Sequence, residues 1–170
     1  MVANSFPAHD VYDHYAAEIA AHLDAGRDVA LICEGDPFLY GSFMYIFQRL
    51  SPTYTVRVIP GVSSLAACAA AAGMPLVSRN QVLAVLPAPM DEDALENALR
   101  QTDAAAIMKI GRHLGKVRRV LRRLDLEAAA QYVERATMAE QRISPLTDVV
   151  DDTAPYFSMI LVRRPEAGAA

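Results

Sequence analysis

The sequence lacks several features that would assign it to a common class of proteins. No apolar run reaches the roughly 20 residues that a membrane-spanning helix needs, and the N-terminal residues contain no basic region followed by an apolar core. We therefore expect neither a spanning helix nor a signal peptide. An excess of basic residues is also absent, because the net charge is -4, so nothing general points to nucleic-acid binding.

Cysteine is scarce, and the histidines do not cluster. Cys33 and Cys68 lie far apart in apolar surroundings, which is typical of small buried side chains in a reducing compartment, and we expect a cytoplasmic protein. The four histidines show no metal-ligand spacing with one another or with the cysteines, so we predict no metal site.

The common nucleotide and nucleophile motifs are missing as well. There is no Gly-x-Gly-x-x-Gly loop, no Gly-x4-Gly-Lys-Ser/Thr loop and no Gly-x-Ser-x-Gly elbow. These absences exclude an ordinary dinucleotide site, a nucleoside-triphosphate loop and a hydrolase elbow. What remains is a globular composition, with 53% hydrophobic and 21% charged residues over 170 positions, enough for one large domain or two small ones.

The first 76 residues predict an α/β arrangement. Residues 8–25 predict a helix that ends at Gly26, with an apolar stripe formed by Val11, Tyr15, Ile19 and Leu23. Residues 28–33 and 55–59 predict strands, each followed by a tight loop and a helix. A strand, loop and helix that occur twice in succession are typical of parallel βαβ units.

A second α/β region follows a linker-like segment, and we place a domain boundary between residues 76 and 77. The predicted domains are 1–76 and 77–163, with a tail over 164–170. In the second domain we expect strands at 81–86, 104–108, 131–135 and 155–162, helices from Met90 and over 111–124, and a turn or short helix at 145–148.

The loop from Glu34 to Ser42 is the most suggestive stretch. It carries two carboxylates and no Lys or Arg, so it is unsuited to phosphates and better suited to a ligand with cationic or donor groups. Asp36 has an alternative role as a cap of the next helix. Ser63 and Ser64 start the following helix, and they are either N-caps or part of a helix start whose N–H groups hold a ligand carboxylate.

Basic residues gather where the strand 104–108 ends. Lys109, Arg112 and His113 are placed to meet a polyanionic substrate through charge-assisted hydrogen bonds. The bases further along the helix predict an ordinary solvated face; they are Lys116, Arg118, Arg119, Arg122 and Arg123. Glu134 and Arg135 are open to a similar interpretation, as a surface pair worth little.

Taken in order, five segments resemble the tetrapyrrole methylase family. They are Glu34-Gly-Asp-Pro-Phe-Leu-Tyr-Gly41, Ile59-Pro-Gly-Val-Ser-Ser-Leu65, Gly73-Met-Pro-Leu76, Met108-Lys-Ile-Gly-Arg112 and Val133-Glu-Arg-Ala-Thr137. Their order and spacing match the family over roughly residues 10–163. Within the family, the Glu-Gly-Asp-Pro loop and the Lys-Ile-Gly-Arg-His segment favour the members that methylate C20 of precorrin-2 in the cobalamin pathway.

The resemblance implies two α/β domains, an N-terminal parallel sheet and a C-terminal mixed sheet, in a homodimer that binds S-adenosylmethionine between the domains. It assigns the cofactor to Asp36, Leu39, Ser63, Ser64, Met108, Ala136 and Thr137. Lys109, Arg112 and His113 are then the candidates for binding the carboxylates of the tetrapyrrole.

One part of the family pattern is absent. The family opens with a strand and a Gly-x-Gly-Pro-Gly-Asp loop, and this sequence begins beyond them, so we expect a truncated N-terminal sheet with an exposed edge. Two alternatives to C20 methylation stay open at this point. One is methylation of another position by a sister enzyme, and the other is a chain that holds the cofactor without transferring the methyl group.

Overall fold

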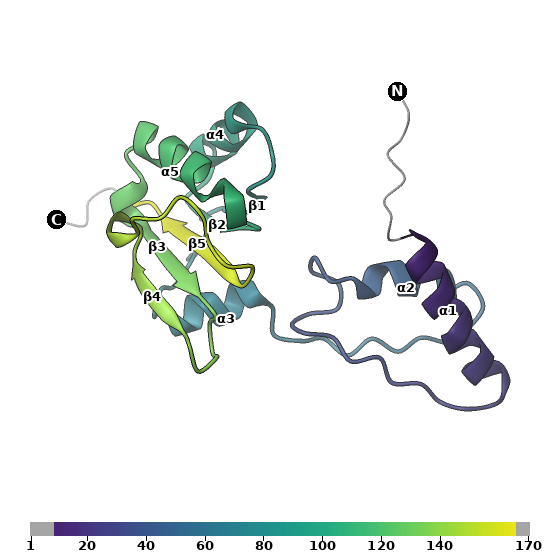
Figure 1. Cartoon of the computed structure of the whole chain (residues 1–170). Coiled ribbons are helices and arrows are strands. Elements are labelled where there is room, and N and C mark those ends of the chain that lie inside the picture. The colour runs from purple at the N-terminus through teal and green to yellow at the C-terminus, as the bar shows by residue number, and fades with distance from the viewer. Residues whose placement is uncertain (1–8, 166–170) are drawn as a thin grey trace, which may run out of the picture. The chain divides into compact units, whose positions relative to one another are not determined.

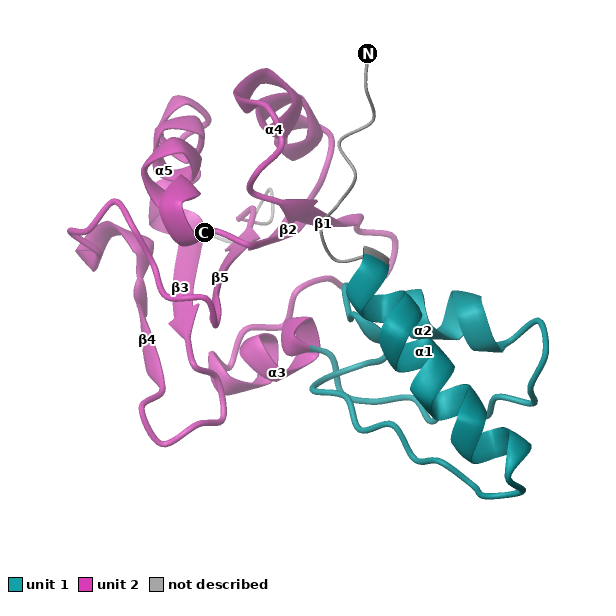
Figure 2. Cartoon of the chain, turned by 45° about the vertical axis from the view of Figure 1, so that its right-hand side comes forward, with its two compact units in different colours: residues 1–63 teal, residues 64–170 magenta. Residues whose placement is uncertain are grey.

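The computed structural model of the chain describes residues 9–165, which form two compact units (Figures 1 and 2). Unit 1 ends at Ser63, and unit 2 begins at Ser64. The predicted boundary between residues 76 and 77 falls inside unit 2, and as the limit of an independently folding domain it stays a prediction. The predicted α/β class is confirmed, with five strands and helices on both faces of one sheet.

Unit 1 contains two helices, α1 (His9–Asp24) and α2 (Phe43–Leu50). Helix α1 ends as predicted at Gly26, whose φ of 73° lies in the left-handed region. The N–H of Gly26 donates to the Leu23 carbonyl at 2.9 Å and that of Arg27 to the His22 carbonyl at 3.2 Å. This pair of bonds satisfies carbonyls that the helix end leaves without a partner.

The face that α1 buries differs from the predicted stripe. Val11 and Tyr15 are half exposed, whereas Ala16 is buried and packs with Ile46 and Leu50 of α2. Residues four apart drift about 40° around a helix at each step, so a strict four-residue repeat leaves the buried face within two turns. Tyr12, Ile19 and Ala20 complete the contact.

The two strands predicted in unit 1 are wrong. Within the described part of this unit, residues 28–33 and 55–59 form no strand. Their apolar side chains are accordingly poorly covered, and Ile32 is 95% exposed. An alternating, β-branched segment becomes a strand only where a neighbouring backbone completes its hydrogen-bond ladder, and these two segments do not pair with each other.

The backbones of Gly35 and Gly61 pack directly on each other. A Cβ built on Gly61 would lie 2.3 Å from the carbonyl oxygen of Gly35 and 3.3 Å from the Cα of Asp36. Real Cβ atoms do not approach backbone atoms this closely, so only glycine fits at position 61. The close contact holds the loop after residue 33 against the loop after residue 59.

Unit 2 is built on a five-stranded mixed sheet. In chain order the strands are β1 (Leu83–Pro87), β2 (Ala104–Met108), β3 (Ala130–Glu134), β4 (Arg142–Pro145) and β5 (Ser158–Arg163). Their order in the sheet is β1-β2-β5-β3-β4. The mixed sheet and four of its strands are confirmed. Sequence reasoning missed β4, which is a short edge strand that ends in proline.

Helices cover both faces of this sheet (Figure 1). The helices are α3 (Ser64–Ala71), α4 (Glu92–Arg100) and α5 (Leu114–Arg123), with short 3₁₀ turns η1 (Gly111–His113), η2 (Glu127–Ala129) and η3 (Leu146–Asp148). One apolar cluster joins α4 and α5 to the sheet, and a second joins α3 to the opposite face. All five residues of β2 are buried between these layers. Burial raises the pKa of the Cys68 thiol, in α3, to about 11.

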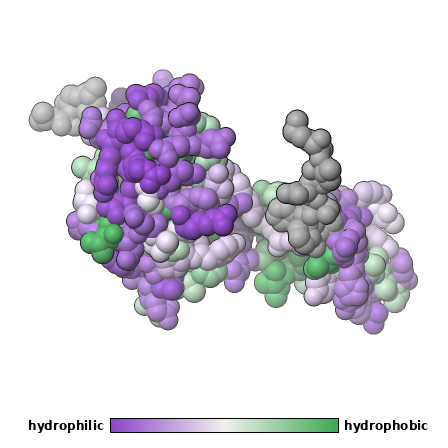
Figure 3. Space-filling view, turned by 45° about the horizontal axis from the view of Figure 1, so that its top comes forward, coloured by the Kyte–Doolittle hydropathy of each residue, from purple (hydrophilic) through white to green (hydrophobic). Residues whose placement is uncertain are grey.

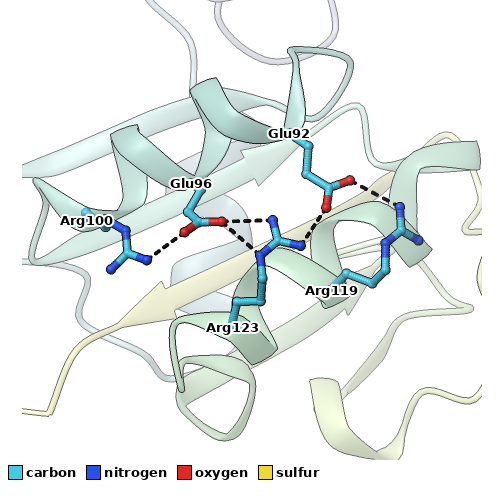
Figure 4. Close-up of polar contacts among 5 residues, drawn as sticks. All are labelled: Glu92, Glu96, Arg100, Arg119 and Arg123. Carbon is cyan, nitrogen blue, oxygen red and sulfur yellow. Dashed lines mark hydrogen bonds and ion pairs between the residues drawn. The ribbon is translucent and has the colours of Figure 1, made fainter.

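Four arginines of α5 form ion pairs with carboxylates; Arg119, Arg122 and Arg123 are exposed as predicted, and the predicted solvated face is wrong for the buried Arg118. Figure 4 shows Arg123 between Glu92 and Glu96 of α4, at 2.7 and 2.8 Å, with Arg119 3.2 Å from Glu92. Arg118 is buried and lies 3.1 Å from Glu127. The face of unit 2 that carries α4 and α5 is accordingly hydrophilic (Figure 3).

The buried arginine yields a stability prediction. Arg118→Ala leaves the Asp151 carbonyl without this donor and leaves Glu127 paired with Arg122 alone, and we expect the free energy of unfolding to fall by roughly 2–3 kcal/mol. The matched control is Arg119→Ala, an exposed residue of the same helix, for which we expect a much smaller loss. Urea unfolding followed by circular dichroism measures both, and equal losses would contradict the distinction.

The glycine contact yields a second prediction. We expect Gly61→Ala to separate the two loops of unit 1, because the added Cβ meets rigid backbone. Amide hydrogen exchange of peptides covering 28–42 and 55–63 should then become faster. The control is Gly115→Ala in α5, where the added Cβ meets only the side chain of Asp152, which can move. Unchanged exchange in the Gly61 variant would show that the contact does not hold the loops.

Candidate functional site

Asp36 joins the two loops of unit 1 that the sequence singles out. Its Oδ1 accepts a hydrogen bond from the Phe38 N–H at 2.9 Å, and its Oδ2 accepts one from the Gly61 N–H at 3.1 Å. These N–H groups, Gly61 first, hold the pKa of the carboxyl below its ordinary value of 3.8. Asp36 is therefore anionic at neutral pH. It does not cap α2, because the N-cap position of that helix is Ser42, six residues later.

The other predicted residues of unit 1 lie on or beside these loops. The Leu39 N–H donates to the Asp36 carbonyl at 3.3 Å, and the Leu39 side chain is partly exposed. Phe38 packs edge-on against Phe47 of α2, with ring centroids 5.0 Å apart. Ser63 is half-buried at the end of the second loop. The loop that carries Asp36 and Leu39 is thus held at both ends.

In unit 2 the strand directions collect the remaining residues at one edge of the sheet. Strands β1 and β2 are parallel, and β5 runs antiparallel to both β2 and β3. Hence β1, β2 and β3 point the same way, and their carboxyl ends share an edge. Met108 ends β2 there and Lys109 to His113 follow it, while Arg135 to Thr137 follow β3. Ligands of open α/β sheets bind beyond such an edge.

Two predicted cofactor residues of this edge pack together. Met108 and Ala136 belong to the same apolar cluster, together with Val133 of β3 and with Met159 of β5, the strand that lies between β2 and β3. Ser64, by contrast, is the exposed first residue of α3. Met108 is buried and Ala136 is half-buried, so this apolar cluster lies at the carboxyl ends of β2 and β3, beside the loops that follow them.

The three predicted substrate residues follow β2 directly. Lys109 and Arg112 are exposed, and His113 is half-buried. Burial lowers the pKa of His113, and the nearby charges of Lys116 and Arg112 lower it further. His113 is therefore neutral at pH 7 and acts as a hydrogen-bonding group, while Lys109 and Arg112 carry the charge.

Glu134 differs from its predicted role as half of a surface pair. It is buried at the end of β3, where it accepts hydrogen bonds from the Tyr132 hydroxyl at 2.9 Å and from Arg135 Nη1. Burial, and then the bond to Glu134, raises the pKa of Tyr132. The prediction of a surface pair is wrong for Glu134, whose carboxylate is removed from solvent, and how much the pair contributes to stability stays a prediction.

Backbone strain marks the same loops. Among the described residues six that are not glycine have positive φ, and four of them lie in the segments that carry the family resemblance: Tyr40 (56°), Lys109 (58°), Arg135 (47°) and Thr137 (67°). Such conformations cost energy and gather at ligand sites. The Thr137 N–H donates to Gln141 Oε1 at 2.6 Å, which helps to hold its turn.

Sequence reasoning missed the partners that hold these residues. Tyr132 donates to Glu134 and Gln141 accepts from Thr137, but neither residue belongs to a motif. The bond between Asp36 and Gly61 joins positions that are distant in the sequence.

Over residues 9–165 no group of three His, Cys, Asp or Glu side chains could hold a metal ion. In that same range every helix is too short or too polar to cross a bilayer.

Comparison with known proteins follows the same segments. Residues 1–149 match the family model described as Tetrapyrrole (Corrin/Porphyrin) Methylases. The precorrin-2 C(20)-methyltransferase of Sinorhizobium sp is 47% identical over 153 residues, which are 90% of this chain and 62% of that protein. The cobalt-precorrin-2 C(20)-methyltransferase of Salmonella typhimurium is 34% identical over 166 residues, 96% of this chain and 70% of that protein.

Among solved structures, the uroporphyrin-III C-methyl transferase of Thermus thermophilus in complex with S-adenyl homocysteine is 21% identical, with a TM-score of 0.64 over 89% of this chain and 72% of that one. This likeness shows the shared fold. The chain spans about three fifths of the length of the Sinorhizobium relative, which it matches over 62%. On the strength of the family match over most of its residues, the chain belongs to the tetrapyrrole (corrin/porphyrin) methylase family.

Proposed function

We propose that the protein is an S-adenosylmethionine-dependent methyltransferase that methylates C20 of precorrin-2, giving precorrin-3A in cobalamin biosynthesis. The observation that carries the proposal is the 47% identity with the Sinorhizobium precorrin-2 C(20)-methyltransferase over 90% of the chain. The other relatives named here act on tetrapyrroles too, by their names. The substrate is therefore a reduced tetrapyrrole with carboxylate side chains.

The residues present fit the cofactor. Met108 and Ala136 provide an apolar surface for the adenosine, since both belong to one apolar cluster at the sheet edge. The anionic Asp36 and its neighbour Leu39 suit the cationic groups of S-adenosylmethionine, and Ser63, Ser64 and Thr137 supply polar atoms. The cofactor supplies a methyl group already activated on sulfur. The protein then needs to position the reactants, which contributes roughly 7–11 kcal/mol in favourable cases.

The substrate residues fit a polycarboxylate. Lys109 and Arg112 offer charged donors and His113 a neutral one, all next to the proposed adenosine surface.

We further propose that the protein is a cytoplasmic homodimer, as the family resemblance implies. Gel filtration with light scattering tests the dimer, and a mass of 18.5 kDa would contradict it.

The proposal is tested first by cofactor binding. Calorimetry should detect S-adenosylhomocysteine binding to the full chain, and Ala136→Leu should weaken it by about tenfold or more, because the larger side chain fills the half-buried adenosine surface. The control is Ala139→Leu, an exposed alanine three residues further along, which should bind normally. Equal affinities of the Ala136 variant and the wild type would contradict the assigned surface.

Turnover is tested next, on precorrin-2 and on its cobalt complex in parallel, since the relatives differ in that name. Methylation of either at C20 supports the proposal, and the ratio of the two rates identifies the substrate form. Absence of cofactor binding contradicts the enzyme assignment. Cofactor binding without turnover on either substrate would instead indicate a chain that holds the cofactor alone.

Substrate binding yields a separate prediction. Arg112→Ala should raise KM for precorrin-2 by about tenfold while kcat changes little, because a charged hydrogen bond to a carboxylate contributes roughly 1.5–3 kcal/mol. Arg119→Ala is the matched control, since Arg119 is paired with Glu92 on the neighbouring helix. If Arg112→Ala leaves both kinetic constants unchanged, Arg112 does not bind the substrate.

A further inference from the structure

Two aromatic side chains stand exposed immediately before β5. Tyr156 is 88% exposed and Phe157 is 48% exposed, and their rings meet edge to face with centroids 5.2 Å apart. Neither residue belongs to a segment that carries the family resemblance. Adjacent large rings left in water on a small domain mark a surface that binds something.

The sheet register places this pair at the proposed site. Strand β5 starts opposite the ends of both neighbours, because Met159 pairs with Met108 and Ser158 pairs with Glu134. The residues just before Ser158 therefore emerge between the loop after β2 and the loop after β3. A backbone hydrogen bond from the Arg135 N–H to the Phe157 carbonyl, at 2.8 Å, fixes that side.

The segment that carries the rings is anchored on its other side as well. The Ala154 N–H donates to the Gly111 carbonyl at 3.0 Å, and the Gly115 N–H donates to the Asp152 carbonyl at 3.2 Å. Arg118 Nη1 donates to the Asp151 carbonyl at 3.3 Å. A platform held in this way loses little conformational freedom when a ligand binds, so more of the contact energy appears as affinity.

The basic residues near the rings differ in whether a carboxylate pairs with them. The arginines of α5 are engaged by Glu92, Glu96 and Glu127. Arg112 forms no ion pair with a carboxylate of residues 9–165, and its contact is with the ring of His113 at 3.5 Å. The Ala154–Gly111 bond puts the aromatic segment beside the residue that precedes Arg112. Aromatic rings and a cation thus lie on one edge.

We propose that Tyr156 and Phe157 form a platform that packs against the flat face of the tetrapyrrole, while Arg112 and Lys109 bind its carboxylates. This inference rests on the proposed function and names the part of the chain that recognises the macrocycle itself. The chemistry matches on both counts, since a porphyrin-like ring offers a broad π-face and its side chains offer anions. The pair determines which ligands bind and takes no part in the methyl transfer.

The test uses uroporphyrin, a flat polycarboxylate, as a fluorescent probe titrated against the full chain. Tyr156→Ala and Phe157→Ala should each weaken binding by about tenfold, the scale of one lost aromatic stacking contact. Tyr156→Phe keeps a ring and should stay within about twofold of the wild type. The control is Val150→Ala, an equally exposed apolar residue of the same loop. Each variant should bind S-adenosylhomocysteine with unchanged affinity, measured by calorimetry.

Each outcome decides a separate question. If both alanine variants bind uroporphyrin as the wild type does, the platform is wrong. A loss of similar size in Val150→Ala, or a parallel loss of S-adenosylhomocysteine binding, would also overturn it, because the effect would then be a general one on the loop. Failure of the wild type to bind S-adenosylhomocysteine overturns the proposed function, while the uroporphyrin titrations still decide the platform.

Discussion

The antiparallel ladders that β5 forms with both β2 and β3 are the constraint on which the arrangement of unit 2 depends. A strand that runs against two neighbours makes those neighbours parallel, so the chain segments that follow them leave from one edge. Burial of β2 on both faces prevents its register from slipping, since a shift of one residue would exchange its two apolar clusters. Met108, Ala136 and Tyr156 share an edge for this reason.

Electrostatics separates the charges that maintain the fold from those that face a ligand. On α5 the guanidinium groups form a ladder with the carboxylates of α4 and η2, which ties three helical segments together. In unit 1 the Asp36 carboxylate is satisfied by backbone N–H groups of two loops and stays ionised. Arg112, which lies at the sheet edge, forms no ion pair with a carboxylate of residues 9–165, and the neutral His113 beside it adds no repulsion.

Much of unit 2 could be predicted from the sequence, because its elements carry strong local signals. The strand predicted at 104–108 and the helices predicted from Met90 and over 111–124 agree with the structure. Unit 1 was predicted less well. Its helices agree with the structure, but the apolar run at 28–33 and the alternating residues 55–59 have strand-like patterns without becoming strands. The apolar pattern of a segment indicates which side chains it can bury. A strand also requires a partner backbone in register to form its hydrogen-bond ladder.

The sequence by itself determined the family and the α/β class and predicted the residues of the candidate site, since all three depend on residue types in a fixed order. Tertiary structure alone decided which carboxylates hold which arginines, that Glu134 is buried, and that Gly61 must approach Gly35. It also decided that Tyr156 and Phe157 emerge beside Arg135. Each of these contacts joins positions far apart in the chain, and the burial of a side chain depends on what surrounds it. The periodicity of a local segment predicts neither.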